Sequence, residues 1–128
     1  MDDIRDLLPR DKFDLERAEA VIARGYPTVA PLLPDLMTWL QDANWPVCKV
    51  IAPFLAGLGT VVVPEVRGVR ETRDEQWKYW VLDYLVRGSL GVEEAIRDQL
   101  TKIAQTEPAN EDEEETYLLA KEILQRLH

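Results

Sequence analysis

The sequence has very little of the residue types on which most metal and nucleophilic sites depend. Among its 128 residues there is one cysteine, Cys48, and one histidine, the terminal His128. One cysteine cannot form an internal disulfide, which excludes the disulfide-stabilised class of small secreted proteins. Zinc sites need several Cys or His ligands, so we expect no metal and no cofactor. A terminal histidine far from the thiol also argues against a Cys-His catalytic pair.

Other catalytic signatures are missing too. The glycine pair at Gly57 and Gly59 is not followed by the Lys-Ser or Lys-Thr of a phosphate-binding loop. The acidic run Glu111 to Glu115 lacks the alternating oxygens and turn glycine of a calcium loop. Pairs of carboxylates are available among 24 acids, but solvated helix faces account for them. We therefore expect no catalytic residues and a protein that is not an enzyme.

Long apolar runs and excess basic charge are absent as well. No stretch approaches 18 apolar residues, and the N-terminus is acidic where a secretory signal is basic. These features predict a soluble, cytoplasmic protein that does not bind membranes. With 15 Lys and Arg against 24 Asp and Glu, the formal charge is −9, which repels phosphate backbones and predicts no binding to nucleic acid.

What is present is enough apolar material for one core. At 46% apolar residues, the chain suits a single domain over residues 1–128. The negative charge is concentrated in the last third, mostly in the run Glu111 to Glu115. Because acidic side chains after an Asn cap stabilise a helix N-terminus, residues 108–128 are predicted to form an acidic C-terminal capping helix. An acidic docking patch for a basic partner is the alternative.

The apolar residues follow helical spacing throughout, with no secure strand. Asp14 is predicted to cap a first helix that ends at Gly25, and Asn44 and Asp74 to cap two later ones. Three prolines within residues 27–41 predict two short helical pieces with a break between them. Residues 61–63 are three valines, but the apolar spacing that continues past them favours a helix.

Two similar four-residue segments suggest an internal repeat of about 32 residues. Asp42-Ala43-Asn44-Trp45 recurs as Asp74-Glu75-Gln76-Trp77, and Gly59 recurs as Gly91. Each copy is two helices long, and helix pairs bury their apolar faces by stacking on neighbouring pairs. The expected fold is all-α: a right-handed α-α superhelix of about three helix pairs.

Three segments carry a resemblance to a known family: Leu32-Leu33-Pro34-Asp35-Leu36, Asp42-Ala43-Asn44-Trp45-Pro46-Val47 and Trp77-Lys78-Tyr79-Trp80. They resemble a bacterial family known as domain of unknown function 5071 (DUF5071), whose small members are similar to HEAT-like repeat proteins. The likeness spans approximately residues 4–105. It implies a HEAT-like fold and no particular reaction.

The aromatic residues gather between positions 39 and 84, beside acidic and polar ones. Because large aromatics anchor interfaces, we expect a binding surface there. The candidate binding residues are Asp42, Asn44, Trp45, Asp74, Trp77, Lys78, Tyr79 and Trp80. A purely structural explanation is also open, in which both tryptophans wedge between helix pairs while Asp42 and Asp74 cap helices. Arg67, Arg70 and Arg73 are expected on a solvated face, and binding of an acidic partner by these arginines is the alternative.

The predicted function is that of a non-catalytic protein-interaction module that binds an unknown protein or peptide, as a monomer or weak homodimer. One alternative is an immunity-type inhibitor whose acidic surface covers a basic toxin or nuclease. Another is a nucleic-acid enzyme on HEAT-like helices, which would need a basic concave face. A small-molecule pocket between the central tryptophans is a further possibility.

Overall fold

The computed structural model describes residues 4–127, which form helices and no strand. The α-helices are α1 (Leu15–Arg24), α2 (Leu33–Met37), α3 (Pro46–Gly57), α4 (Val63–Arg70), α5 (Glu75–Val81), α6 (Leu90–Ala95), α7 (Arg97–Ala104) and α8 (Glu111–Arg126). The described residues also form four 3-10 helices: η1 (Ile4–Leu7), η2 (Ala30–Leu32), η3 (Thr38–Gln41) and η4 (Gly59–Val62). Helix α5 continues directly as a π-helix, η5 (Leu82–Val86). The predicted all-helical fold is confirmed for these residues.

Three predicted N-caps are confirmed by their hydrogen bonds. Asp14 accepts from the Arg17 amide, Asp74 from the Trp77 amide and Asn110 from the Glu113 amide. Each bond satisfies one of the amide groups that a helix start leaves without a partner.

The predicted cap at Asn44 is wrong. The N-cap of α3 is Trp45, which has no side-chain cap bond. Asn44 instead lies in a turn, where its amide donates to Asp42 Oδ1 at 2.8 Å. Pro46 occupies the first position of α3, where a missing amide hydrogen costs nothing, so this helix starts without a side-chain cap.

The proline-rich segment 30–41 is continuous rather than broken. It runs as η2, α2 and η3 without an intervening loop, because Pro31 and Pro34 both lie in the first turn of the helix that contains them. An interruption is found near the end of the chain instead, at Ile96, whose φ of −112° and ψ of 20° separate α6 from α7.

The buried side chains recur every 30 residues, not every 32. Leu32 and Leu36 correspond to Val62 and Val66, and these in turn to Val92 and Ile96; all six are fully buried. The first helices of the pairs show the same spacing, since Ala18 and Val21 correspond to Cys48 and Ile51. The alignment that paired Trp45 with Trp77 is therefore wrong by two residues.

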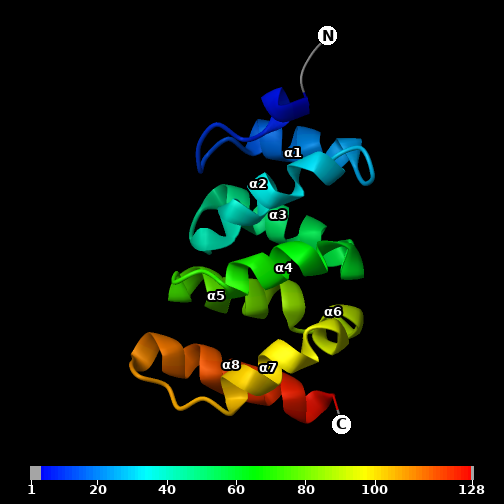
Figure 1. Cartoon of the computed structure of the whole chain (residues 1–128). Coiled ribbons are helices and arrows are strands. Elements are labelled where there is room, and N and C mark those ends of the chain that lie inside the picture. Colours follow the sequence, from blue (N-terminus) through cyan, green and yellow to red (C-terminus); the bar gives the residue numbers. More distant parts are fainter. Residues whose placement is uncertain (1–3, 128) are drawn as a thin grey trace.

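Successive helices are layered from one end of the molecule to the other, with η1 and α8 at opposite ends (Figure 1). Helix α1 contacts α3, α3 contacts η5, and α5 contacts α8. On the other side of the stack, α2 contacts α4, and α6 contacts η4. Each pair thus buries its apolar side against the pair before it and the pair after it, and one continuous core results.

Helix α8 closes the stack by packing against both α5 and α7. Its buried positions are Thr116, Leu119, Ala120 and Ile123. An ion pair between half-exposed Arg126 and buried Glu93 ties its end to α6: Arg126 Nη2 donates to Glu93 Oε2 at 3.1 Å, and the Gly88 amide donates to Glu93 Oε1 at 3.3 Å. The acidic residues of its first turn lie at the opposite end of the helix, as the sequence predicts.

Within residues 4–127 no single helix is long and apolar enough to cross a membrane. One helix pair, Pro46–Gly57 with Gly59–Arg70, reaches that length and composition together, and it is bent by 119°.

Candidate functional site

The predicted binding residues fall into two separate groups rather than one surface. The first group flanks the segment from Met37 to Trp39. The Trp77 indole Nε1 donates to the Met37 carbonyl at 3.0 Å, and the Trp45 ring packs edge-on against Trp39 with ring centroids 5.8 Å apart. Trp45 and Trp77 are both half-buried and pack on the core. These contacts support a structural role for the two tryptophans.

The polar residues among the predicted binding residues form hydrogen bonds with backbone amides or an ion pair with a neighbouring side chain. Asp74 caps α5 through the Trp77 amide at 3.0 Å, whereas Asp42 holds the turn at Asn44. Lys78 Nζ lies 2.9 Å from Glu75 Oε1, and only 12% of the Lys78 side chain is exposed. Lys78 is therefore engaged within its own helix and offers little cationic surface to a partner.

The second group is aromatic and lies on α5 and η5. Tyr79 contacts Trp80 edge-on with centroids 5.1 Å apart, and Trp80 lies 5.7 Å from the Tyr84 ring, one turn further along. Val81 and Leu85 of the same helix are buried, while Trp80 is half-buried and Tyr84 is 47% exposed. We call Tyr79, Trp80 and Tyr84 the α5 aromatic face.

Charge surrounds this face. Arg87 forms an ion pair with Asp83 one turn earlier and lies 3.4 Å from Glu122 of α8. Partial burial, followed by the negative charges of Asp83 and Glu115, raises the pKa of the Tyr79 phenol.

The sequence prediction missed two concave features. The smaller, of about 300 Å³, is lined by Pro34, Met37, Pro64, Glu65, Gly68, Val69 and Trp77. Glu65 Oε2 is buried without a hydrogen-bond partner among residues 4–127. The segment Val62-Val63-Pro64-Glu65-Val66 repeats Leu32-Leu33-Pro34-Asp35-Leu36 at 30 residues, and this repeat was the available signal for pairing α2 with α4.

The larger feature lies where α4 ends, α5 begins, α7 ends and α8 begins, and measures about 510 Å³. Arg70 lines it, contrary to the prediction of a solvated arginine face. Of the three arginines, Arg73 is exposed, whereas Arg67 pairs with Asp98 of α7 at 3.0 Å. Burial lowers the pKa of the Arg70 guanidinium, an effect that the charge of Glu75 opposes. We call this feature the Arg70 cavity.

Burial keeps the thiol of Cys48 protonated, and the acidic groups in the part of the chain described form no metal-binding cluster. Cys48 is buried in α3, and desolvation raises the pKa of its thiol to about 11. A thiol that stays protonated is a poor nucleophile and a poor metal ligand. Residues 4–127 hold no group of three or more His, Cys, Asp or Glu able to bind a metal, and His128 lies outside the described residues.

Comparison with known proteins places the chain in a family. A family model described as a domain of unknown function, DUF5071, matches residues 7–124. The chain belongs to the DUF5071 family. The match covers α1 and most of α8, so the acidic last helix is part of the DUF5071 domain and not an appendage to it. Among the curated proteins, no sequence matches the chain.

Proposed function

We propose that this DUF5071 domain is a HEAT-like stack, a right-handed α-α superhelix of about three helix pairs closed by α8. Three features support the proposal: α1 contacts α3 and α3 contacts η5 in order, buried positions recur at 30 residues, and α8 contacts both α5 and α7. Stacks of this kind present broad surfaces to other macromolecules.

We infer that the domain is a non-catalytic protein-interaction module whose contact surface is the α5 aromatic face. The observation that carries this is the exposure of Tyr84 and the partial exposure of Trp80 beside it. Their rings lie 5.7 Å apart, and neither belongs to the core in which Val81 and Leu85 are buried. Burying these rings against a partner removes apolar area from water, and tryptophan and tyrosine are the side chains that contribute most at interface centres.

The charge of the domain indicates the kind of partner. The first turn of α8 carries four acids, Glu111 to Glu114, and the chain carries a formal charge of −9. We therefore expect a basic protein partner in the bacterial cytoplasm. Opposite charges at the rim of such an interface raise the association rate more than they raise affinity.

The test is site-specific photo-crosslinking in the native cell. A photoreactive phenylalanine analogue replaces Tyr84 in one variant and Phe13, which is 67% exposed at the opposite end of the stack, in a control variant. We expect one protein to crosslink from position 84 and not from position 13, and Trp80→Ala to abolish this product. Equal crosslinking from both positions, or no effect of Trp80→Ala, would remove the α5 aromatic face from consideration.

A specific observation favours an immunity-type inhibitor as the second candidate. Acidic residues on α8 form a solvent-exposed surface that could cover the basic active site of a toxin or nuclease; they include Glu111, Asp112, Glu114 and Glu115. Association would then slow steeply as salt rises from 50 to 500 mM, because screening shortens the reach of the field. An association rate that is independent of salt would argue against this candidate.

A further inference from the structure

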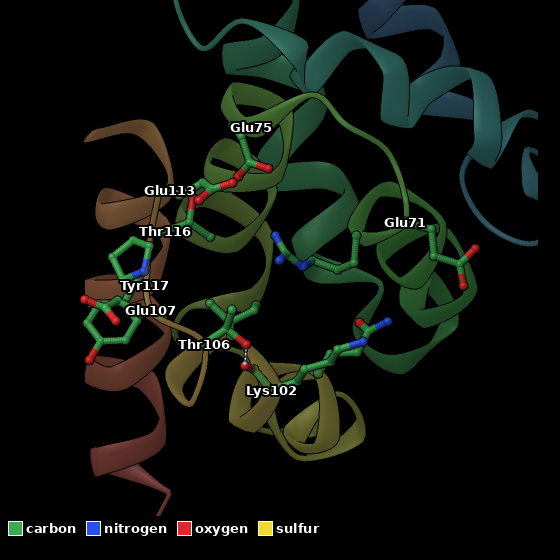
Figure 2. Close-up of a pocket in the computed structure, with 12 residues that line it drawn as sticks. Glu71, Glu75, Lys102, Thr106, Glu107, Glu113, Thr116 and Tyr117 are labelled. Carbon is green, nitrogen blue, oxygen red and sulfur yellow. Dashed lines mark hydrogen bonds between the residues drawn. The ribbon is translucent and has the colours of Figure 1, made fainter. Parts of the chain in front are cut away.

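The Arg70 cavity is a candidate ligand-binding site that is separate from the α5 aromatic face. It opens between the ends of α4 and α7 and the starts of α5 and α8, and about 510 Å³ is within the range of small-molecule sites. Figure 2 shows Glu75, Glu113 and Thr116 gathered on one side of the opening and Lys102 and Thr106 on another. The α5 aromatic face contributes no residue to its lining.

Two residues of this cavity hold polar atoms that have no partner. Arg70 Nη1, a donor, and Gln99 Oε1, an acceptor, are both buried and make no hydrogen bond among the residues the structure describes. A buried polar atom without a partner destabilises the folded state, and more so when the group is charged. An occupant that brings an acceptor to Arg70 and a donor to Gln99 would relieve both costs, and the adjoining cavity supplies the room for it.

The charged residues that line the cavity indicate which class of ligand it can bind. Arg70 and Lys102 contribute two positive charges, against four carboxylates from Glu71, Glu75, Glu107 and Glu113. Two of the acids already have partners: Glu75 pairs with Lys78 at 2.9 Å, and Glu113 Oε2 accepts from the Ala109 amide at 2.6 Å. A dianionic phosphate would meet an excess of negative charge. A ligand with one carboxylate and a separate cation matches the lining better.

Apolar surface lies between these charged groups. Ile103, Pro108 and Tyr117 all line the cavity, from the end of α7, the connection and α8 respectively. They are placed to contact the carbon chain of a ligand whose two ends are charged. Basic amino acids, free or at the end of a peptide, have this arrangement of carboxylate, methylene chain and cation.

We propose that the Arg70 cavity binds a basic zwitterion, with its carboxylate on Arg70 and its cationic end on the acidic rim at Glu107. Gln99 accepts a hydrogen bond from the α-nitrogen. This site is independent of the α5 aromatic face and goes beyond the proposed interaction function. Because Arg70 and Lys102 come from α4 and α7, while Tyr117 and Glu113 come from α8, an occupant would also join the last helix to the rest of the stack.

The experiment is isothermal titration calorimetry of the full chain with four probes. L-Arginine has the carboxylate, the methylene chain and the cation, whereas agmatine lacks the carboxylate. Inorganic phosphate supplies only an anion, and Gly-Gly-Arg presents the same three groups at a peptide C-terminus. We expect binding of L-arginine or Gly-Gly-Arg with Kd below about 1 mM, and at least tenfold weaker binding of agmatine and phosphate. Preference between the first two distinguishes a free amino acid from a peptide terminus.

Single substitutions test whether the probe binds in the Arg70 cavity. Arg70→Met should weaken the favoured probe at least tenfold, while Arg73→Gln, at an exposed arginine three residues away, should leave the affinity unchanged. Glu107→Gln, at an exposed position that cannot disturb folding, should weaken binding about three- to tenfold if the rim holds the cation. No heat with either arginine probe at 10 mM, equal binding of agmatine, or unchanged affinity in both Arg70→Met and Glu107→Gln would each overturn the proposal.

Discussion

The ion pair between buried Glu93 and half-exposed Arg126 gives a stability prediction that the structure makes quantitative. Glu93 is fully buried, and its carboxylate has two partners, Arg126 Nη2 at 3.1 Å and the Gly88 amide at 3.3 Å. Replacing Arg126 by methionine keeps most of the side-chain volume but leaves the carboxylate with the amide alone. The charge of Glu93 is then uncompensated in the interior between α6 and α8.

The expected loss of unfolding free energy follows from how deeply each of the two side chains is buried. Removing one partner of a fully buried pair costs about 3–5 kcal/mol, because the remaining charge stays desolvated. Arg126 is 46% exposed, so solvent reaches one side of the pair and screens it. We therefore expect Arg126→Met to lower the free energy of unfolding by about 2 kcal/mol, with a fall in Tm of roughly 6–10 °C for a domain of this size.

The assay is urea unfolding followed by tryptophan fluorescence, with Arg97→Met as the matched control. Arg97 pairs with Glu94 at the surface, where 57% of the Glu94 side chain is exposed, so its loss should cost no more than about 1 kcal/mol. The double variant Glu93→Met, Arg126→Met should recover much of the stability, since no charge is left buried. A loss below about 0.5 kcal/mol for Arg126→Met, or a double variant less stable than both single ones, would refute the reasoning.

Three further predictions concern the core and the caps. Asp74→Ala should lower the free energy of unfolding by about 1 kcal/mol, measured by thermal melting, because α5 loses its cap; Asp42→Ala should cost less, since Asp42 holds only a turn. Ile51→Ala should cost about 2–5 kcal/mol in urea, because Ile51 is fully buried in α3. The raised pKa of Cys48 predicts that stability falls as pH rises from 9 to about 11, since the unfolded chain loses its thiol proton first. Cys48→Ala should flatten this part of the profile, and iodoacetamide should label the folded protein at pH 8 far more slowly than the unfolded one; equal labelling rates would contradict the burial of the thiol.

Local signals in the sequence predicted much of the fold. Asp14, Asp74 and Asn110 begin helices because their side chains accept amide hydrogens, and this chemistry acts within a few residues. Residues 61–63 are helical although they are β-branched, because Val62 and Val66 bury the same side. The period of the repeat was harder to predict. Tryptophan is conspicuous, but burial is set by smaller residues such as Leu32 and Val62, which recur at 30 positions.

The candidate site was only partly predictable, for a similar reason. Tyr79 and Trp80 were identified from their size and helical spacing, and their use as a binding surface stays a prediction. Arg70 could not be placed, because its cavity forms only where α4, α7 and α8 meet, and these segments are far apart in the sequence. Spacing along one helix indicates which residues share a side of it, but not which other helix will cover that side.

The position of α8 bears on how the domain can be used in protein engineering. Since α8 contacts both α5 and α7, in the stack proposed above it occupies the place that a further helix pair would take. Longer arrays made by fusing copies of this domain head to tail would need α8 deleted from every copy except the last. If α8 were kept, the next copy would meet a helix whose apolar residues Leu119, Ala120 and Ile123 are already buried.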